Sequence, residues 1–304
     1  MLRFTLSALC LLVLGGVAAA DVKLQTKALP NTKRVYQIDQ KSEQVLTIGP
    51  QDVETKTSTF IVQNQNAGPK LPDGSVEIVE KIDVLQNEIN LPGGLTFQFD
   101  SANPDKKADN PLLEPIAVLL RLTFKNPVTV VMDASGKVSS VRFAEDVASQ
   151  AGEEFRSMFD PERRKKAANQ ALSYLPAEAV KVGDTWEFSI EADLGSGQTL
   201  TITSKVEYKG TTDVGGKTLH RLVSTPQTVS YAMDPNTKSP LKVLESDLKP
   251  TEGAGEYLFD AEAGELYKSE SKVRIQGSMK MEAGGQQFPG KLDLTLTGKV
   301  ARQP

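Results

Sequence analysis

Alternating apolar and polar side chains limit what this chain can fold into more than any other feature. The alternation is clear in Arg34–Asp39, Lys56–Val62, Ser75–Val79 and Leu95–Asp100. Successive side chains of a strand point to opposite faces, so this pattern predicts strands with one buried face and one solvated face. The pattern returns from Trp186 onward, with turns rich in Gly, Asp and Asn between the strands. We therefore expect antiparallel sheets connected by hairpins.

Two segments have the spacing of a helix instead. In Pro111–Leu122 the apolar residues recur three and four positions apart, and Pro111 suits the first position of a helix. The second segment, Ala144–Tyr174, is divided at Asp160-Pro161, where Asp160 can cap a new helix that begins with Pro161. We expect a buried apolar helix at 111–122 and a helical connector at 143–174.

One short pattern occurs twice. Val130–Val138 and Tyr257–Leu266 both read as apolar residues, an Asp, a short polar turn, a Gly, a polar residue and an apolar residue. This weak repeat predicts two related β-rich halves, at 21–142 and 175–304. The expected fold is α+β and β-dominated: curved antiparallel sheets in two related halves, with the apolar helix against the first sheet and the connector between the halves.

Residues 1–20 have the features of a secretory signal peptide. Arg3 precedes an apolar run, and Ala18 to Ala20 form a small-residue cleavage site, so we expect cleavage between Ala20 and Asp21. A membrane anchor is the alternative, but the run is short of the roughly 20 residues that span a bilayer. Leu112–Phe124, the richest later apolar stretch, is also short and is interrupted by charges. We expect an exported protein, periplasmic or secreted, without a transmembrane segment after signal removal.

The composition limits the available chemistry. The only Cys is Cys10, which leaves with the signal peptide, and the only His is His220. Zinc sites and most pairs of nucleophile and base therefore lack their parts. The mature chain would carry 34 basic and 39 acidic residues, and this balance disfavours nucleic acid as a partner. We expect a protein that is not an enzyme and that uses no cofactor.

Two motifs carry a resemblance to known proteins. Leu175–Trp186 contains the strand entry "LP…VGDxW", and Phe259–Leu266 contains the late hairpin "FDxxxGxL". In these motifs the chain resembles a family of uncharacterised exported bacterial proteins. At a greater distance, the expected fold is similar to the half-barrels of the lipoprotein-carrier superfamily. This likeness implies a curved sheet around a helix and no assigned activity.

The candidate site residues each have a structural alternative. Asp260, Glu262 and Glu265 place oxygens at alternate positions, as a Ca²⁺ site requires, but a hairpin turn with Asp first and Gly in the left-handed region explains them as well. The first copy of the pattern has only Asp133, so a metal would not be common to both. His220 lies in an alternating segment without a recognisable nucleophile, which favours a structural role.

Three further groups of residues also have both a functional and a structural interpretation. The cations Arg163–Lys166 could bind an anion, or they could form a solvated helix face. Trp186 and Phe188 share a strand face and could line a ligand site or belong to the core. Acid pairs such as Asp83 with Glu88, or Glu153 with Glu154, could serve glycoside hydrolysis, although their spacing is that of ordinary surface acids.

Three functional hypotheses follow. The first is an exported, non-enzymatic envelope protein that binds an apolar ligand or lipid on a concave sheet face, which requires a pocket of at least about 300 Å³. The second is a structural or protein-interaction module of the envelope, which predicts an exposed apolar patch or strand edge. The third is a hydrolase with two carboxyl groups about 5–9.5 Å apart in a cleft.

Overall fold

The computed structural model describes residues 21–153, 155–195, 197–233 and 241–304. The expected signal peptide, with Ala20, lies outside the described residues, and Asp21 is the first of them. Within these ranges no helix has the length and apolar character needed to cross a bilayer.

The described chain forms one antiparallel sheet of twelve strands. The strands are long, as alternating sequences with few internal breaks allow. Their bounds are β1 (Lys33–Ile48), β2 (Gln51–Lys70), β3 (Val76–Asn90), β4 (Thr96–Asp100), β5 (Val128–Met132), β6 (Val138–Arg142), β7 (Thr185–Gly195), β8 (Gln198–Val214), β9 (Lys217–Met233), β10 (Leu241–Asp260), β11 (Glu265–Ala283) and β12 (Gln286–Arg302).

The sheet is continuous from one half of the sequence to the other. Its order is β6-β5-β3-β2-β1-β12-β11-β10-β9-β8-β7, and β4 pairs with β3. The first strand pairs with the last from Tyr36 opposite Arg302 to Ile48 opposite Gly290. The expectation of separate sheets is therefore wrong. The physical reason is that pairing β1 with β12 satisfies the backbone groups of two strand edges, which separate sheets would leave unpaired.

The repeated pattern does not mark equivalent parts of two related halves. Its first copy forms the turn between β5 and β6 at one edge of the sheet, whereas its second forms the turn between β10 and β11 in the interior. The two copies share a turn chemistry, with Gly136 and Gly264 in the left-handed region at φ +79° and +63°. Local turn requirements, not a duplicated architecture, account for their likeness.

The helices lie between the two sets of strands in the sequence. The 3₁₀ turn η2 (Pro111–Leu113) leads into α1 (Glu114–Lys125), slightly later than expected, and α1 packs on β3 and β4 around Leu85, Phe97 and Phe99. The connector contains α2 (Val147–Gln150), η3 (Arg156–Phe159) and α3 (Pro161–Leu172). As predicted, Asp160 caps α3 by accepting a 2.8 Å hydrogen bond from the Arg163 N–H, with Pro161 first in the helix.

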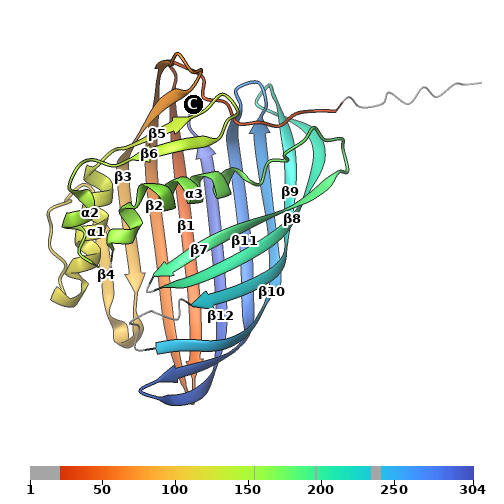
Figure 1. Ribbon diagram of the computed structural model, residues 1–304. Coiled ribbons are helices and arrows are strands. Elements are labelled where there is room, and N and C mark those ends of the chain that lie inside the picture. The colour runs from red at the N-terminus through yellow and green to blue at the C-terminus, as the bar shows by residue number, and fades with distance from the viewer. Residues whose placement is uncertain (1–20, 154, 196, 234–240) are drawn as a thin grey trace, which may run out of the picture.

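The sheet is strongly curved, and α3 lies across its concave side (Figure 1). Polar side chains of α3 bind to both edge strands of the sheet, β6 and β7. On the β6 side, the Asn169 side chain accepts from the Val138 N–H and donates to the Val138 carbonyl, both at 2.9 Å. On the β7 side, Lys166 pairs with Glu191 at 2.6 Å. Because α3 buries none of its residues fully, polar contacts at the two edges hold it in place.

Candidate binding cavity on the concave face

The two faces of β1 differ in chemistry. The residues at odd positions 39–43, on the convex face, are Asp39, Lys41 and Glu43, and two of their six cross-strand neighbours, Lys299 and Lys56, are also charged. On the concave face, Tyr36 and Ile38 come first, a polar stretch from Gln40 to Gln44 follows, and Leu46 and Ile48 are apolar again. The concave face is therefore apolar at both ends and polar in the middle.

A cavity of about 490 Å³ occupies this middle region. One wall comes from β1 and β2, the other from β7 and β8, and β9 to β12 form the floor between them. The apolar part of the lining includes Phe188, Ile190, Ile202, Val273 and Leu296. Because two walls far apart in the sheet order face each other, the curvature of the sheet creates this cavity.

Two apolar clusters close the ends of the cavity. At the end near α3, Tyr257 stacks on Tyr174 with ring centres 4.6 Å apart, and Phe188 meets Tyr257 edge-on at 6.5 Å. Burial raises the pKa of Tyr174 and of Tyr257 above the usual tyrosine value. The cluster at the opposite end is built around Ile275 and Met281, both fully buried. These clusters stabilise the fold and leave the region between them unfilled.

A second cavity of about 310 Å³ lies under α3 on the same concave face. Its lining includes Tyr36 and Ile38 of β1 and the small side chains Ala167, Ala168 and Ala171 of α3. Tyr174 lines this second cavity, while its stacking partner Tyr257 lines the larger one. The aromatic pair therefore stands between the two cavities.

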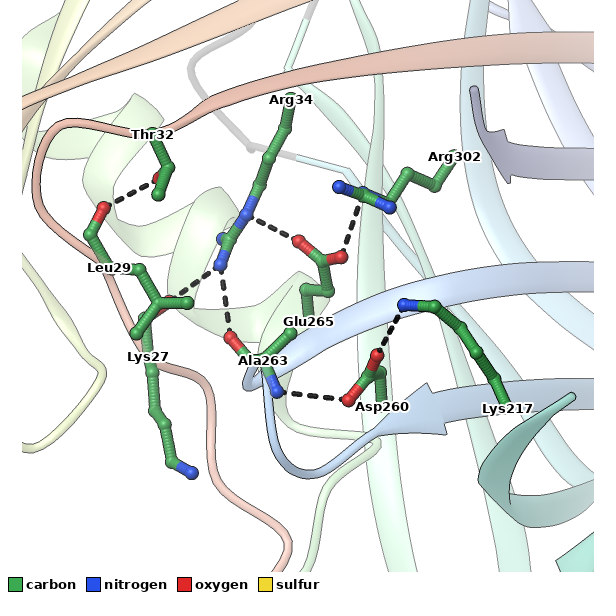
Figure 2. Close-up of polar contacts among 9 residues, drawn as sticks. All are labelled: Lys27, Leu29, Thr32, Arg34, Lys217, Asp260, Ala263, Glu265 and Arg302. Atoms are coloured by element: carbon green, nitrogen blue, oxygen red, sulfur yellow. Dashed lines mark hydrogen bonds and ion pairs between the residues drawn. The ribbon is translucent and has the colours of Figure 1, made fainter. Parts of the chain in front are cut away.

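The lining of the second cavity includes Arg34 and Glu265, which belong to a buried ion-pair cluster (Figure 2). The Glu265 carboxylate pairs with Arg34 and lies 2.8 Å from Arg302 Nε, and Glu265 is only 4 % exposed. Arg34 also donates to the Ala263 carbonyl at 3.0 Å. Tyr36 lies beside the cluster, and burial, with a smaller contribution from the Glu265 charge, raises the pKa of Tyr36 to about 12.

The three candidate metal ligands lie in or beside this cluster. Asp260 accepts from the Ala263 N–H at 2.9 Å and from Lys217 at 3.1 Å. Burial works against ionisation of Asp260, but these two hydrogen bonds outweigh it and hold the pKa of Asp260 below its usual value. Glu265 is engaged by arginines, and the Glu262 carbonyl accepts from Lys27. Protein cations and backbone N–H groups therefore use the oxygens of Asp260 and Glu265.

Both repeated turns hold the first described residues, 21–29, which we call the N-terminal strap. Val22 and Val180 exchange two backbone hydrogen bonds of 2.9 Å, and Leu24 is buried in the aromatic cluster near α3. The Lys27 N–H donates to the Gly264 carbonyl at 2.9 Å. At Gly136, any side chain would meet the Thr26 carbonyl oxygen. Each turn therefore needs its Gly for the close approach of the strap as well as for backbone conformation.

The remaining candidates do not line the larger cavity, with the exception of Phe188. His220 Nδ1 lies 2.7 Å from the Tyr208 hydroxyl, and burial lowers the pKa of His220 in spite of nearby Asp260. Trp186 donates to the Tyr174 carbonyl at 3.1 Å. These contacts hold the core near α3.

The cation run and the acid pairs also have partners within the protein. Arg164 pairs with Glu80 at 3.3 Å and Lys165 with Glu162. Asp83 accepts from Asn64 at 3.0 Å, and Glu88 accepts from Asn90 at the same distance. Glu154 lies outside the described residues. The larger cavity contains no member of either group.

Sequence reasoning missed the polar middle of the concave face. The signal was present in β1, where Gln40, Ser42 and Gln44 interrupt a face that is apolar on both sides. Alternation alone would place these three polar residues on the solvated face only if the register of β1 shifted by one residue. Such a shift would move all the other β1 side chains to the opposite face as well. Recognising the interruption as the lining of a cavity requires the curvature and the opposite wall.

Comparison with known proteins adds a family match. A model described as a family of unknown function (DUF6263) matches residues 73–218, just under half of the chain. The match includes the strand entry at 175–186 and ends before the late hairpin at 259–266. No curated protein matches the chain.

Solved structures give only distant similarities. A lipovitellin structure concerned with lipid–protein interactions is 10% identical, covers 91% of this chain and has a TM-score of 0.46. This chain spans only 26% of that lipovitellin chain. A Bacteroides fragilis protein described as exported, with a YmcC-like fold, is 9% identical over 90% of this chain and 98% of that one, with a TM-score of 0.23. Pseudomonas aeruginosa OpdQ is 8% identical over 90% of this chain and 99% of that one, with a TM-score of 0.22. These TM-scores support no conclusion about a shared fold or function.

Proposed function

We propose that this protein is exported to the cell envelope and binds an apolar ligand in the larger concave cavity, without catalysing a reaction. The cavity is the observation that carries the proposal. Its volume of about 490 Å³ lies within the range of about 300–1,000 Å³ that small-molecule sites occupy. The envelope location is inferred from the signal-like features of residues 1–20.

The lining of the cavity favours binding over catalysis. Its described residues supply aliphatic, aromatic, hydroxyl and amide groups and two lysines, Lys41 and Lys272, but no carboxylate or imidazole to act as a general base. Each methylene moved from water into an apolar site contributes about 0.8 kcal/mol, so roughly ten carbons provide the order of magnitude needed for micromolar binding. Binding of a medium-length hydrocarbon chain is therefore physically reasonable.

A neutral fluorescent probe tests the proposal. N-phenyl-1-naphthylamine brightens in apolar surroundings, and we expect saturable binding to the purified mature chain. Ala192→Trp, which fills the cavity, should weaken binding at least tenfold. Ser189→Trp places the same bulk on the opposite face of β7 and should leave binding unchanged, since Ser189 is exposed and does not line the cavity.

Folding of each variant is checked by thermal unfolding. If Ala192→Trp does not fold, Ile190→Trp serves in its place, because Ile190 lines the cavity and is 41% exposed. Absence of saturable probe binding would overturn the proposal, as would equal binding by wild type and a folded cavity-filling variant.

A further inference from the structure

We infer that the ligand of this cavity is an uncharged amphiphile, such as a glycerol ester of a fatty acid, whose polar group binds to a row of neutral side chains. The inference rests on the proposed function, because it names the ligand class for the same cavity. It is carried by the strand register, by unused hydrogen-bonding groups and by the placement of charges.

Strand register aligns the row across the concave face. Residues directly opposite each other on neighbouring strands share a face, and seven such residues lie side by side from β9 to β3. We call them the polar row: Ser224, Gly255, Ser271, Gly298, Gln40, Thr59 and Asn87.

The neighbouring rows on the same face are more apolar. On the side toward α3 stand Tyr257, Val300 and Ile38 at the corresponding positions. On the other side stand Val273 and Leu296, and this row becomes polar again at Ser42 and Thr57 on β1 and β2. A ligand lying along the strands would therefore place one polar group at the row and apolar parts beside it.

The row contains hydrogen-bonding groups that the protein does not use. Gln40 and Ser271 are exposed, and neither side chain has a hydrogen-bond partner in the described part of the chain. Asn87 is 9% exposed and donates to Thr59 Oγ1 at 2.8 Å, which leaves the Thr59 hydroxyl hydrogen free to donate. Asn87 Oδ1 is also buried without a partner, but Asn87 lines a different cavity beside β4 and α1. The groups that a ligand in the larger cavity can reach are therefore those of Gln40, Ser271 and Thr59.

One glycine leaves space beside these groups. Gly298 lies between Gln40 and Ser271 in the row and lines the cavity. The nearest atom to a side chain added there would be the Ser271 hydroxyl oxygen at 3.4 Å, whereas at Gly255 the corresponding space is taken by Ser224. A polar group of a ligand can therefore approach Gln40 and Ser271 closely at Gly298.

The charges of the protein are directed elsewhere. No member of the polar row is ionisable. Lys41 and Lys272 also border the cavity, but they alternate with row residues along their strands, which assigns their side chains to the convex face. Lys272 Nζ pairs with Glu252 at 3.6 Å. The arginines on the concave face pair with acids near α3. A carboxylate at the row would lose its hydration without gaining a cation. A hydroxyl or ester group, in contrast, meets both donors and acceptors there.

Competition between two ligands of equal chain length tests the inference. Monolauroylglycerol and laurate would each displace N-phenyl-1-naphthylamine from the wild-type chain at pH 8. We expect the glycerol ester to act at a concentration at least tenfold lower than laurate. Gln40→Met keeps the side-chain length and should raise the inhibition constant of the ester, calculated with the probe affinity measured for the same variant, about threefold to tenfold, as loss of one hydrogen bond predicts.

Glu43→Met is the control. It introduces the same side chain three residues along β1, on the opposite face, at an exposed residue that does not line the cavity, and it should change neither displacement. If laurate competes as well as the ester, or if Gln40→Met leaves ester binding unchanged, the inference is wrong even though the probe binds. If the probe does not bind to wild type, the proposed function itself fails.

Discussion

Two polar regions on the concave face of one strand, β1, behave in opposite ways. Arg34 is buried against Glu265 and donates to the Ala263 carbonyl at 3.0 Å. Gln40, six positions along the same face, is exposed and has no side-chain partner in the described part of the chain. The difference shows that polar groups enter this concave face in two ways: paired with each other to hold the end near α3, or left open in the cavity where a ligand can meet them.

Glu265→Gln tests whether the buried ion-pair cluster stabilises the fold more than the open polar region around Gln40 does. Removing the charge leaves Arg34 and Arg302 without their buried counter-ion, and we expect a loss of about 3–5 kcal/mol in the free energy of unfolding. Gln40→Met should change it by less than about 0.5 kcal/mol. Urea unfolding followed by circular dichroism measures both variants. Equal effects would mean that the cluster is not a stabilising unit.

Gly136→Ala tests how tightly the N-terminal strap is held. The new methyl group would meet the Thr26 carbonyl, and the left-handed backbone adds a strain of about 1–2 kcal/mol. We expect a total loss of about 2–4 kcal/mol. Gly284→Ala is the control, because its φ is +58° and no atom lies within 4 Å of the added carbon; it should cost only the backbone strain. Thermal unfolding measures both variants. Equal losses of stability would show that the strap can move away from Gly136.

The dependence of stability on alkaline pH gives the smallest effect. Folding raises the pKa of Tyr36 from 10.0 to about 12, so between these values the folded protein keeps a proton that the unfolded chain loses. The free energy of unfolding should therefore fall as pH rises through this window, with Tyr36 contributing about 1.4 kcal/mol per pH unit. Tyr36→Phe should make the decline shallower. Urea titrations at pH 9 and 11 measure the slope, and identical slopes would contradict the burial of the Tyr36 hydroxyl beside Glu265.

Much of the fold was predictable from the sequence, because local rules determine it. The alternation in Arg34–Asp39 places β1, and the Asp160-Pro161 pair marks the start of α3. The arrangement of strands was not predictable in this way. The pairing of β1 with β12 brings together residues from opposite ends of the chain, and no local pattern reports such a contact. The duplicated turn suggested two related halves, whereas both turns share a requirement for glycine beside the strap.

The candidate site was less predictable than the fold. Asp260 and Glu265 stood out because acids near a Gly resemble a metal loop, yet their oxygens are held by Lys217, Arg34 and Arg302. The polar row stood out in no single segment, since each strand contributes one ordinary residue. Its members become a site only when the register of seven strands is known.

The pairing of the first strand with the last also has a consequence for how the protein reaches its folded state. The Gln303 side chain donates to Gln37, 266 positions earlier in the sequence, so the centre of the sheet forms only when both ends of the chain are present. Domains dominated by such distant contacts fold slowly, because the long intervening chain must be ordered before the contacts stabilise it. We therefore expect the pairing of β1 with β12 to form last, after β12 has been synthesised.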